Sequence, residues 1–148
     1  MTEANATILK FGYPDTLIHD YPNWLILLRP QQVTAGALVL AHRGGATAFS
    51  DLSPAAFAEL AQVIPDIERN LKALVEYERI NYLMLMMVDP HVHFHVIPRY
   101  AGSRTIAAME VPDHGWPKTP DLTKFLQPPA DDLARIAQSV RAAWRRQA

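Results

Sequence analysis

The pattern of apolar residues in the first third of the chain predicts three short strands. Apolar runs at 16–19, 24–28 and 37–42 have the length of strands, and turn residues such as Pro22 and Pro30 separate them. Short apolar runs divided by turns of this kind are typical of antiparallel strands. We therefore expect the chain to begin with three strands of an antiparallel sheet.

A long helix is predicted next. Ser53 can cap the free amide groups of a helix, and Pro54 is suited to the first helical position. Apolar residues then recur at steps of three and four as far as Tyr77, which indicates one buried stripe. Pro65 lies inside that stripe and removes a backbone hydrogen bond, so we expect it to kink the helix or to split it in two.

The remaining pattern predicts two more strands and a terminal helix. Apolar runs at 81–88 and 91–97 are separated only by an Asp-Pro pair, which predicts a hairpin. Residues 101–130 lack periodicity and are rich in proline and glycine, so we expect an irregular segment before a helix at 131–144. This order is an α+β fold, βββ-α-ββ, with an antiparallel sheet of about five strands.

Composition narrows the class of protein. The chain has 148 residues, of which 49% are hydrophobic and 20% charged, with a formal net charge of −1 and no cysteine. One domain is expected, with no excess of cations for nucleic acid and no disulfide or thiolate site. It opens without a basic and apolar leader, and no apolar run approaches the roughly 20 residues of a membrane helix. We therefore expect a cytoplasmic protein without a membrane partner.

Three of the six histidines lie within five residues, at His91, His93 and His95. Side chains alternate between faces along a strand, so a spacing of two places the three imidazoles on one face. Val92 and Phe94 then lie on the other. Each buried ring brings nitrogens that need hydrogen-bond partners, so three in a row do little for packing. The cluster therefore predicts a chemical role.

Two kinds of chemistry fit such a row. Imidazoles bind zinc or iron, but same-face residues stand about 7 Å apart along a strand. A further ligand, such as His42, His114 or Asp89, would have to come from elsewhere. A neutral imidazole is also a nucleophile toward phosphorus, and a protonated neighbour can stabilise an anion or a leaving group. The row can supply both of these roles without a metal.

The segment from His91 to Arg99, with the sequence HVHFHVIPR, matches the histidine triad signature, in which three histidines alternate with apolar residues. Its Pro-Arg continuation resembles the fragile-histidine-triad branch of that superfamily. The wider resemblance covers residues 12–100, with residues 101–148 as a C-terminal extension. We therefore expect one histidine-triad-like domain over residues 1–148.

The resemblance implies a nucleotide-binding fold and a reaction at phosphorus. Members of the family are usually homodimers that hydrolyse or transfer nucleotidyl groups by attack on an α-phosphate. By this resemblance His93 would be the nucleophile that forms a nucleotidyl-histidine, and His91 and His95 would bind phosphate oxygens and support the leaving group. The transferase branch of the superfamily carries glutamine at the third position of the motif. This chain has His95 there, which resembles the hydrolase branches.

Three positions depart from the family pattern. Ala37 stands where family hydrolases commonly carry a fourth histidine. Arg29 stands where family hydrolases carry an aspartate or asparagine that holds the ribose hydroxyls. Because arginine prefers to bind an anion, we expect Arg29 to contact the nucleotide. A glycine-rich loop that contacts phosphate normally precedes the triad, whereas here the connection is only 88–90. We therefore expect a shortened phosphate cradle.

Three further residues are candidates for binding the nucleotide. Arg99 follows the triad and could face phosphate or merely solvate the end of a strand. Asp89 could orient a triad imidazole or start a turn. Trp116 could stack on a base, reach across a dimer or pin its loop to the core. Three methionines before the triad, at 84, 86 and 87, are expected to fill the core.

Three functions are compatible with these residues. The first is a hydrolase that cleaves a phosphoanhydride or phosphoramidate through His93, with dinucleoside polyphosphates or nucleoside phosphoramidates as the implied substrates. The second is a nucleotide-binding protein with little or no turnover. The third is a metal-dependent hydrolase that uses the histidine row. For the first we expect no required cofactor and no metal ligands in the chain, although a divalent ion could accompany the substrate.

Overall fold

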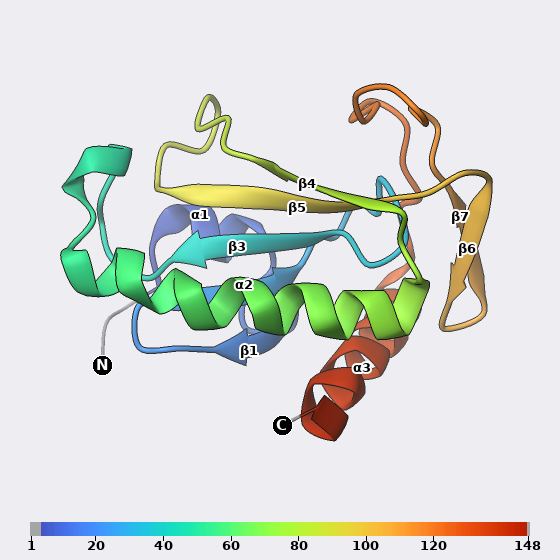
Figure 1. The fold of residues 1–148 in the computed structure, drawn as a ribbon, viewed down its shortest axis with the longest axis horizontal. Coiled ribbons are helices and arrows are strands. Elements are labelled where there is room, and N and C mark those ends of the chain that lie inside the picture. The colour runs from blue at the N-terminus through green and yellow to red at the C-terminus, as the bar shows by residue number, and fades with distance from the viewer. Residues whose placement is uncertain (1–3, 148) are drawn as a thin grey trace.

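A five-stranded antiparallel sheet organises residues 4–147, which are the part of the chain that the computed structural model describes (Figure 1). The strands lie in the order β1-β2-β3-β5-β4. The α+β class with about five antiparallel strands is thereby confirmed. The expectation that the chain opens without a basic and apolar leader involves residues 1–3, which lie outside the described residues. The strands of the sheet are β1 (Leu17–Asp20), β2 (Trp24–Leu28), β3 (Leu38–His42), β4 (Arg79–Leu83) and β5 (His93–Arg99).

Three α-helices accompany the sheet: α1 (Ala6–Lys10), α2 (Pro54–Val75) and α3 (Ala130–Gln147). The Oγ of Ser53 accepts a hydrogen bond from the backbone N–H of Ala56, which caps α2 as the sequence predicts. Pro65 lies within α2 without splitting it. A short 3-10 helix, Phe49–Asp51, precedes α2, and no helix among the described residues is long and apolar enough to cross a membrane.

The two faces of the sheet are covered differently. The face toward α2 carries the main core, in which Ile26, Leu40 and Val96 are fully buried together with apolar residues of α2 and α3. The opposite face carries a smaller cluster beneath α1 and the segment that follows it (Figure 1). That cluster contains Ile8, Leu25, Leu27, Val39 and Ala41, with Phe11, Tyr13 and Leu17 packed against it. Strand alternation therefore separates a thickly covered face from a thinly covered one.

The two strands before and within the triad pair as the predicted antiparallel hairpin, but the connection between them is longer than predicted. β4 ends at Leu83 and β5 begins at His93, so residues 84–92 form a nine-residue loop rather than strand and tight turn. Met86 has φ of 50°, a left-handed conformation that cannot continue a strand. The apolar run through Met84–Val88 was therefore misread, because hydrophobicity alone does not distinguish a strand from an apolar loop.

The segment 101–130 is also more ordered than we expected. It contains a two-stranded hairpin of β6 (Ser103–Ile106) and β7 (Met109–Pro112). The turn between them uses Ala107 and Ala108, with φ of 47° and 65°. Such turns usually carry Gly, Asn or Asp, so two alanines give no signal of a hairpin in the sequence.

A buried ion pair fixes this C-terminal segment to the sheet. The Arg99 Nε lies 2.7 Å from Asp113 Oδ2, and its Nη2 lies 3.1 Å from Oδ1, with side-chain exposures of 4% and 1%. Arg99 also donates to the Asn81 side chain, and Asp113 accepts from the backbone N–H groups of Tyr100 and Gly115. Both charges are thus fully hydrogen-bonded, which is the condition under which a buried pair is tolerated.

Because each partner leaves a buried charge if the other is removed, Arg99→Met or Asp113→Leu alone should lower the free energy of unfolding by about 3–5 kcal/mol. The double substitution, which removes both charges, should recover a large part of that loss. Urea unfolding would measure these effects. As a control, Arg135→Met breaks an exposed pair with Asp132 and should cost less than about 1 kcal/mol.

Candidate active site

β5 places two histidines side by side on the thinly covered face. His93 pairs with Ala41 and His95 with Val39 across the ladder to β3, and their ring centroids are 5.0 Å apart. Both residues are buried, with exposures of 1% and 7%. The Phe11 ring lies 5.8 Å from the His93 ring and 5.7 Å from the His95 ring. The two imidazoles therefore stand together in a largely apolar setting.

The hydrogen bonds of His93 select its tautomer. Its Nδ1 lies 2.7 Å from the backbone carbonyl oxygen of His91. A carbonyl oxygen can only accept, so Nδ1 carries the proton, and in the neutral ring the lone pair is on Nε2. His93 lines a pocket, and its Nε2 has no hydrogen-bond partner among residues 4–147. Nε2 is therefore available as a nucleophile.

His91 differs from the other two histidines of the triad. It lies in the loop before β5, so the prediction of three imidazoles along one strand is wrong in that detail. Its Nδ1 is 2.9 Å from the Thr7 Oγ1 in α1, and it does not line the pocket that contains His93 and His95. In this structure, His91 connects the loop to α1 and supplies the carbonyl oxygen that orients His93.

Arg29 reaches His95 from the end of β2. The backbone N–H of Arg29 donates to the Ala37 carbonyl, so Arg29 extends over a small, fully buried residue. Its Nε is 3.4 Å from the His95 Nδ1, and its Nη1 donates to the Gln31 carbonyl at 2.7 Å. Since Nε of arginine can only donate, the His95 Nδ1 is unprotonated, and the proton of the neutral ring is on Nε2.

The environment of His95 keeps its ring neutral. Burial is the main cause, and the neighbouring Arg29 and His93 add to it, so that the pKa of His95 falls from 6.5 to about 4, against an opposing effect of Asp89. At neutral pH, His95 is therefore a neutral donor through Nε2–H rather than an imidazolium. This environment separates its role from that of His93, whose Nε2 carries a lone pair.

A buried glutamine shapes the turn from which Arg29 emerges. The fully buried Gln32 donates through Nε2 to the carbonyl oxygens of Arg29 at 2.6 Å and Ala37 at 3.0 Å. Its Oε1 accepts from the backbone N–H of Gly36 at 2.9 Å. These bonds close the connection between β2 and β3. Sequence reasoning missed Gln32, because a lone glutamine in a turn carries no distinctive signal.

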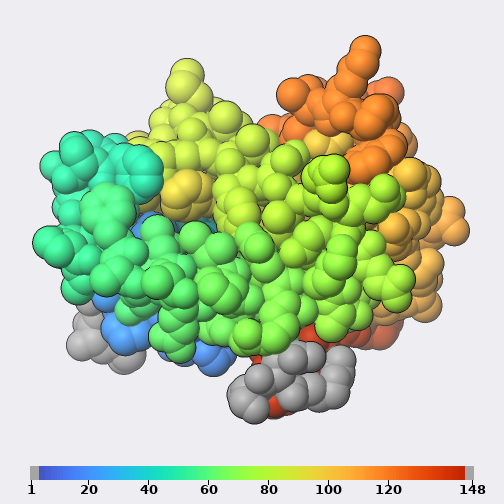
Figure 2. Space-filling model, in the orientation of Figure 1, coloured from blue at the N-terminus to red at the C-terminus, as the bar shows by residue number. Residues whose placement is uncertain are grey.

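A pocket of about 460 Å³ opens beside the two histidines. One wall comes from the apolar loop that joins β4 to β5, where Met87 and Val88 are 84% and 83% exposed. This loop projects from the upper rim of the surface in Figure 2. The expectation that the methionines fill the core is confirmed for Met84 and Met86, although Met86 also lines the pocket, and it is wrong for Met87. The expected three-residue connection before the triad is also wrong. The pocket is lined by Lys10, Phe11, Arg29, Pro30, Gln31, Leu85, Met86, Met87, Val88, Asp89, His93, His95, Leu122 and Gln127.

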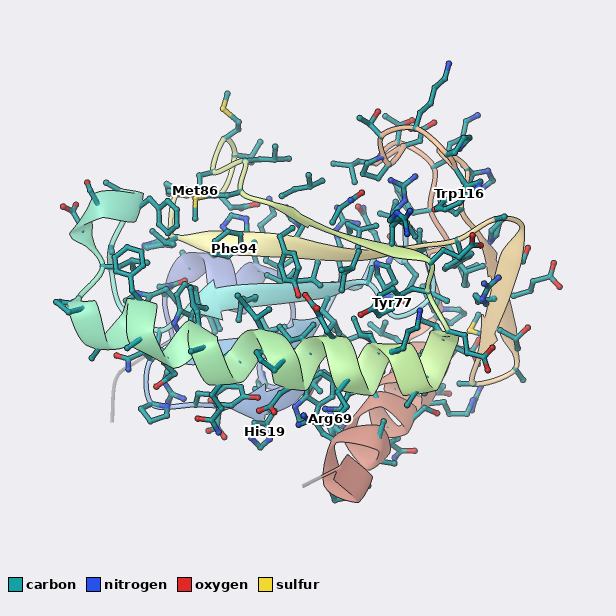
Figure 3. The ribbon with its side chains drawn as sticks, in the orientation of Figure 1. His19, Arg69, Tyr77, Met86, Phe94 and Trp116 are labelled. Carbon is teal, nitrogen blue, oxygen red and sulfur yellow. The ribbon has the colours of Figure 1, made fainter. Side chains whose placement is uncertain are left out.

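The other candidate residues divide between two places. Asp89 lines the same pocket as the histidines, and its carboxylate lies 2.8 Å from the Lys10 Nζ. Arg99 and Trp116 line a different pocket beside β4, and Figure 3 shows Trp116 at the other end of the sheet from Met86. The structure therefore brings Arg29 and Asp89 to the histidines but does not bring Arg99 or Trp116 there.

The histidines offered as additional metal ligands are also dispersed. The Nδ1 of His42 accepts from the backbone N–H of Gly44, and His114 is exposed in the C-terminal segment. Within residues 4–147, no group of three or more His, Cys, Asp or Glu side chains is arranged to hold a metal ion. A metal ligand set like the one considered from the sequence is therefore not assembled in the described residues.

Comparison with known proteins identifies the family of the chain and agrees with its fold. The family model described as HIT domain matches residues 12–102, which is more than half of the chain, so the chain belongs to the HIT family. This is a family of nucleotide-binding proteins and nucleotide hydrolases. No curated protein sequence matches the chain.

Solved structures of histidine triad proteins share the fold over almost the whole chain. A protein from Bradyrhizobium japonicum has a TM-score of 0.70 at 22% identity, covering 98% of this chain and 96% of its own. One from Marinobacter aquaeolei has a TM-score of 0.74 at 16% identity, covering 100% and 99%. A zinc-bound histidine triad family protein from Mycobacterium smegmatis has a TM-score of 0.63 at 19% identity, covering 95% and 91%.

The lowered pKa of His95 predicts a specific dependence of stability on pH. Between pH 6.5 and about 4 the unfolded chain binds a proton at this residue and the folded chain does not. Stability should therefore fall as the pH falls through this range, with His95 accounting for on the order of 2 kcal/mol between pH 7 and pH 5. Urea unfolding at several pH values would measure it. His95→Asn should flatten the profile, whereas the exposed control His114→Asn should leave it unchanged.

Proposed function

We propose that the protein hydrolyses or transfers a nucleotidyl group through a covalent intermediate on His93. The substrates would be dinucleoside polyphosphates or nucleoside phosphoramidates. The observation that carries this proposal is the hydrogen bond from the His93 Nδ1–H to the His91 carbonyl, which leaves the Nε2 lone pair free beside the pocket. Membership of the HIT family supports the same class of reaction.

The reaction has two displacements at phosphorus. In the first, the His93 Nε2 attacks the α-phosphorus, an N–P bond forms, and the P–O or P–N bond to the leaving group breaks. A phosphate leaves as an anion, and an amine takes a proton from solvent. In the second, water attacks the phosphorus, its proton passes to solvent, the N–P bond breaks, and a nucleoside monophosphate is released. The Nε2–H of neutral His95 is suited to donate to a phosphoryl oxygen.

The chain's own residues can carry out these steps without a resident metal ion. His93 supplies the nucleophile and His95 a donor, and Asp89, paired with Lys10, lines the same pocket. A divalent ion bound to the substrate is compatible with this scheme. If instead the purified protein itself holds a stoichiometric metal ion and loses activity when that ion is removed, the proposal of a reaction without a resident metal ion is wrong.

The apolar loop favours a second candidate function. Exposed Met87 and Val88 offer no side-chain donors to a phosphate chain. A protein that binds nucleotides with little or no turnover is consistent with such a wall. This candidate and the hydrolase differ in whether a nucleotidyl-histidine forms.

Intact-protein mass after brief incubation with adenosine phosphoramidate or diadenosine polyphosphates distinguishes the two. The hydrolase should gain the mass of one nucleotidyl group, in an acid-labile bond, and release AMP. His93→Ala should abolish the adduct and reduce turnover by about a thousandfold or more, because the nucleophile is removed.

The matched control is His114→Ala, which removes an exposed histidine outside the pocket and should retain both adduct and turnover. Tight binding of the nucleotides without adduct or product would favour the binding protein. An adduct that persists in His93→Ala would contradict the assignment of the nucleophile.

We further propose that the protein is a cytoplasmic homodimer that pairs through β4. This strand lies at the edge of the sheet in the described residues, next to β5 only. Ile80 stands opposite Pro98, which has no N–H, so the N–H and C=O of Ile80 point to the open edge. A second copy could extend the sheet there, as unpaired edges readily do.

Sedimentation or light scattering should therefore give about twice the mass of 16.6 kDa. Ile80→Pro removes the outward N–H and should weaken the dimer, whereas Ile80→Ala keeps that N–H and should not. A monomer at all concentrations would contradict this proposal without affecting the assignment of His93.

A further inference from the structure

Arg29 is a buried cation without an acidic partner. It is only 8% exposed, and within residues 4–147 no carboxylate lies within 4 Å of its guanidinium. Its hydrogen bonds go to two neutral acceptors, the His95 Nδ1 and the Gln31 carbonyl. Burying a charge is unfavourable unless it is paired, so this arrangement calls for an anion.

A second arginine of the same fold is buried to a similar extent but has an acidic partner. Arg99, 3% exposed, is held by both oxygens of Asp113 and by the Asn81 side chain. Arg29 has no such partner, and it differs in one further respect, because it lines the pocket of the two histidines. The missing counter-charge of Arg29 therefore faces a space that a ligand can enter.

The position of Arg29 separates it from the reacting phosphate. It contacts the Nδ1 edge of the His95 ring, whereas the donor available to a phosphate is Nε2–H on the opposite edge. The guanidinium therefore lies on the Nδ1 side of the His95 ring, whereas a phosphate that accepts from His95 Nε2–H would lie on the Nε2 side.

Among the other charges of the pocket, none substitutes for this role. The Lys10 ammonium is already paired with Asp89, and that carboxylate disfavours a further anion at the rim. The remaining lining is histidine, amide or apolar. Within the described residues, Arg29 is therefore the one cationic side chain of the pocket, apart from the histidines, that is not neutralised by a carboxylate.

From this geometry we infer that the substrate carries a second phosphate, apart from the one that reacts, and that Arg29 binds it. This inference rests on the proposed function and narrows its substrate class to nucleotides with two separated phosphoryl groups. The second phosphate could be attached to the sugar or could belong to the polyphosphate chain. Arginine is well suited to it, because its fork of donors matches phosphate oxygens.

Binding measurements by calorimetry can test the inference independently of turnover. The probes are AMP, adenosine 2′,5′-bisphosphate, adenosine 3′,5′-bisphosphate and α,β-methylene-ADP, which distinguish a sugar phosphate from a chain phosphate. At least one doubly phosphorylated probe should bind the wild-type protein about tenfold or more tightly than AMP.

Two substitutions locate that preference. Arg29→Met keeps an unbranched apolar stem but removes the guanidinium and its charge, so it should abolish the preference and leave AMP binding within about threefold of the wild type. Lys10→Met removes the other cation of the pocket and should retain the preference. Circular dichroism of each variant checks that the fold is unchanged.

The inference is overturned if AMP binds the wild type as tightly as every doubly phosphorylated probe. It is also overturned if Arg29→Met weakens AMP as much as the others, since Arg29 would then hold the reacting phosphate. Either result combined with formation of the His93 adduct leaves the proposed function intact. Absence of both binding and adduct overturns the proposed function and this inference together.

Discussion

The pairing of β5 with β3 is the interaction on which the rest of the structure depends. His95 stands opposite Val39, and Val96 stands opposite Leu38. Because successive side chains take opposite faces, this register buries Val96 against α2 and directs His95 to the thinly covered face. A slip by one residue would exchange the two sets, placing imidazoles in the main core. The apolar residues of β5 thus fix the position of the chemistry on its other face.

Prediction from the sequence succeeded where local pattern and tertiary environment agree. The apolar run of β2 is buried along its whole length, and α2 begins after its Ser53 cap. His93 and His95 were also found, because alternation in a strand is a simple and reliable geometry. Pro65 is an exception, because it was expected to lie in the buried stripe and to kink or split the helix, whereas α2 continues through it as one element and its side chain is exposed.

The failures have physical reasons. In the apolar run 84–88, Met84 packs against the main core and the next four residues line the pocket, so the run is not a strand. The turn at Ala107 and Ala108 adopts a conformation that alanine rarely signals. Arg99 lies next to the triad in sequence, but six residues of extended strand carry it about 20 Å from His93. The contact between Arg29 and His95 joins residues 66 apart, and no local pattern reports it. Such features depend on the assembled sheet.

The thin cover over the histidines has a consequence for dynamics. α1 has only five residues, too few to be stable as an isolated helix. It is attached to the rest of the protein by the fully buried Ile8, by two hydrogen bonds from Asn5 to the carbonyl oxygens of His42 and Gly44, by the bond between Thr7 and His91, and by the ion pair of Lys10 with Asp89. Local unfolding of this segment would uncover His93 while the sheet and α2 stay folded. Hydrogen exchange in α1 would therefore report the opening of the site, at a free energy below that of global unfolding.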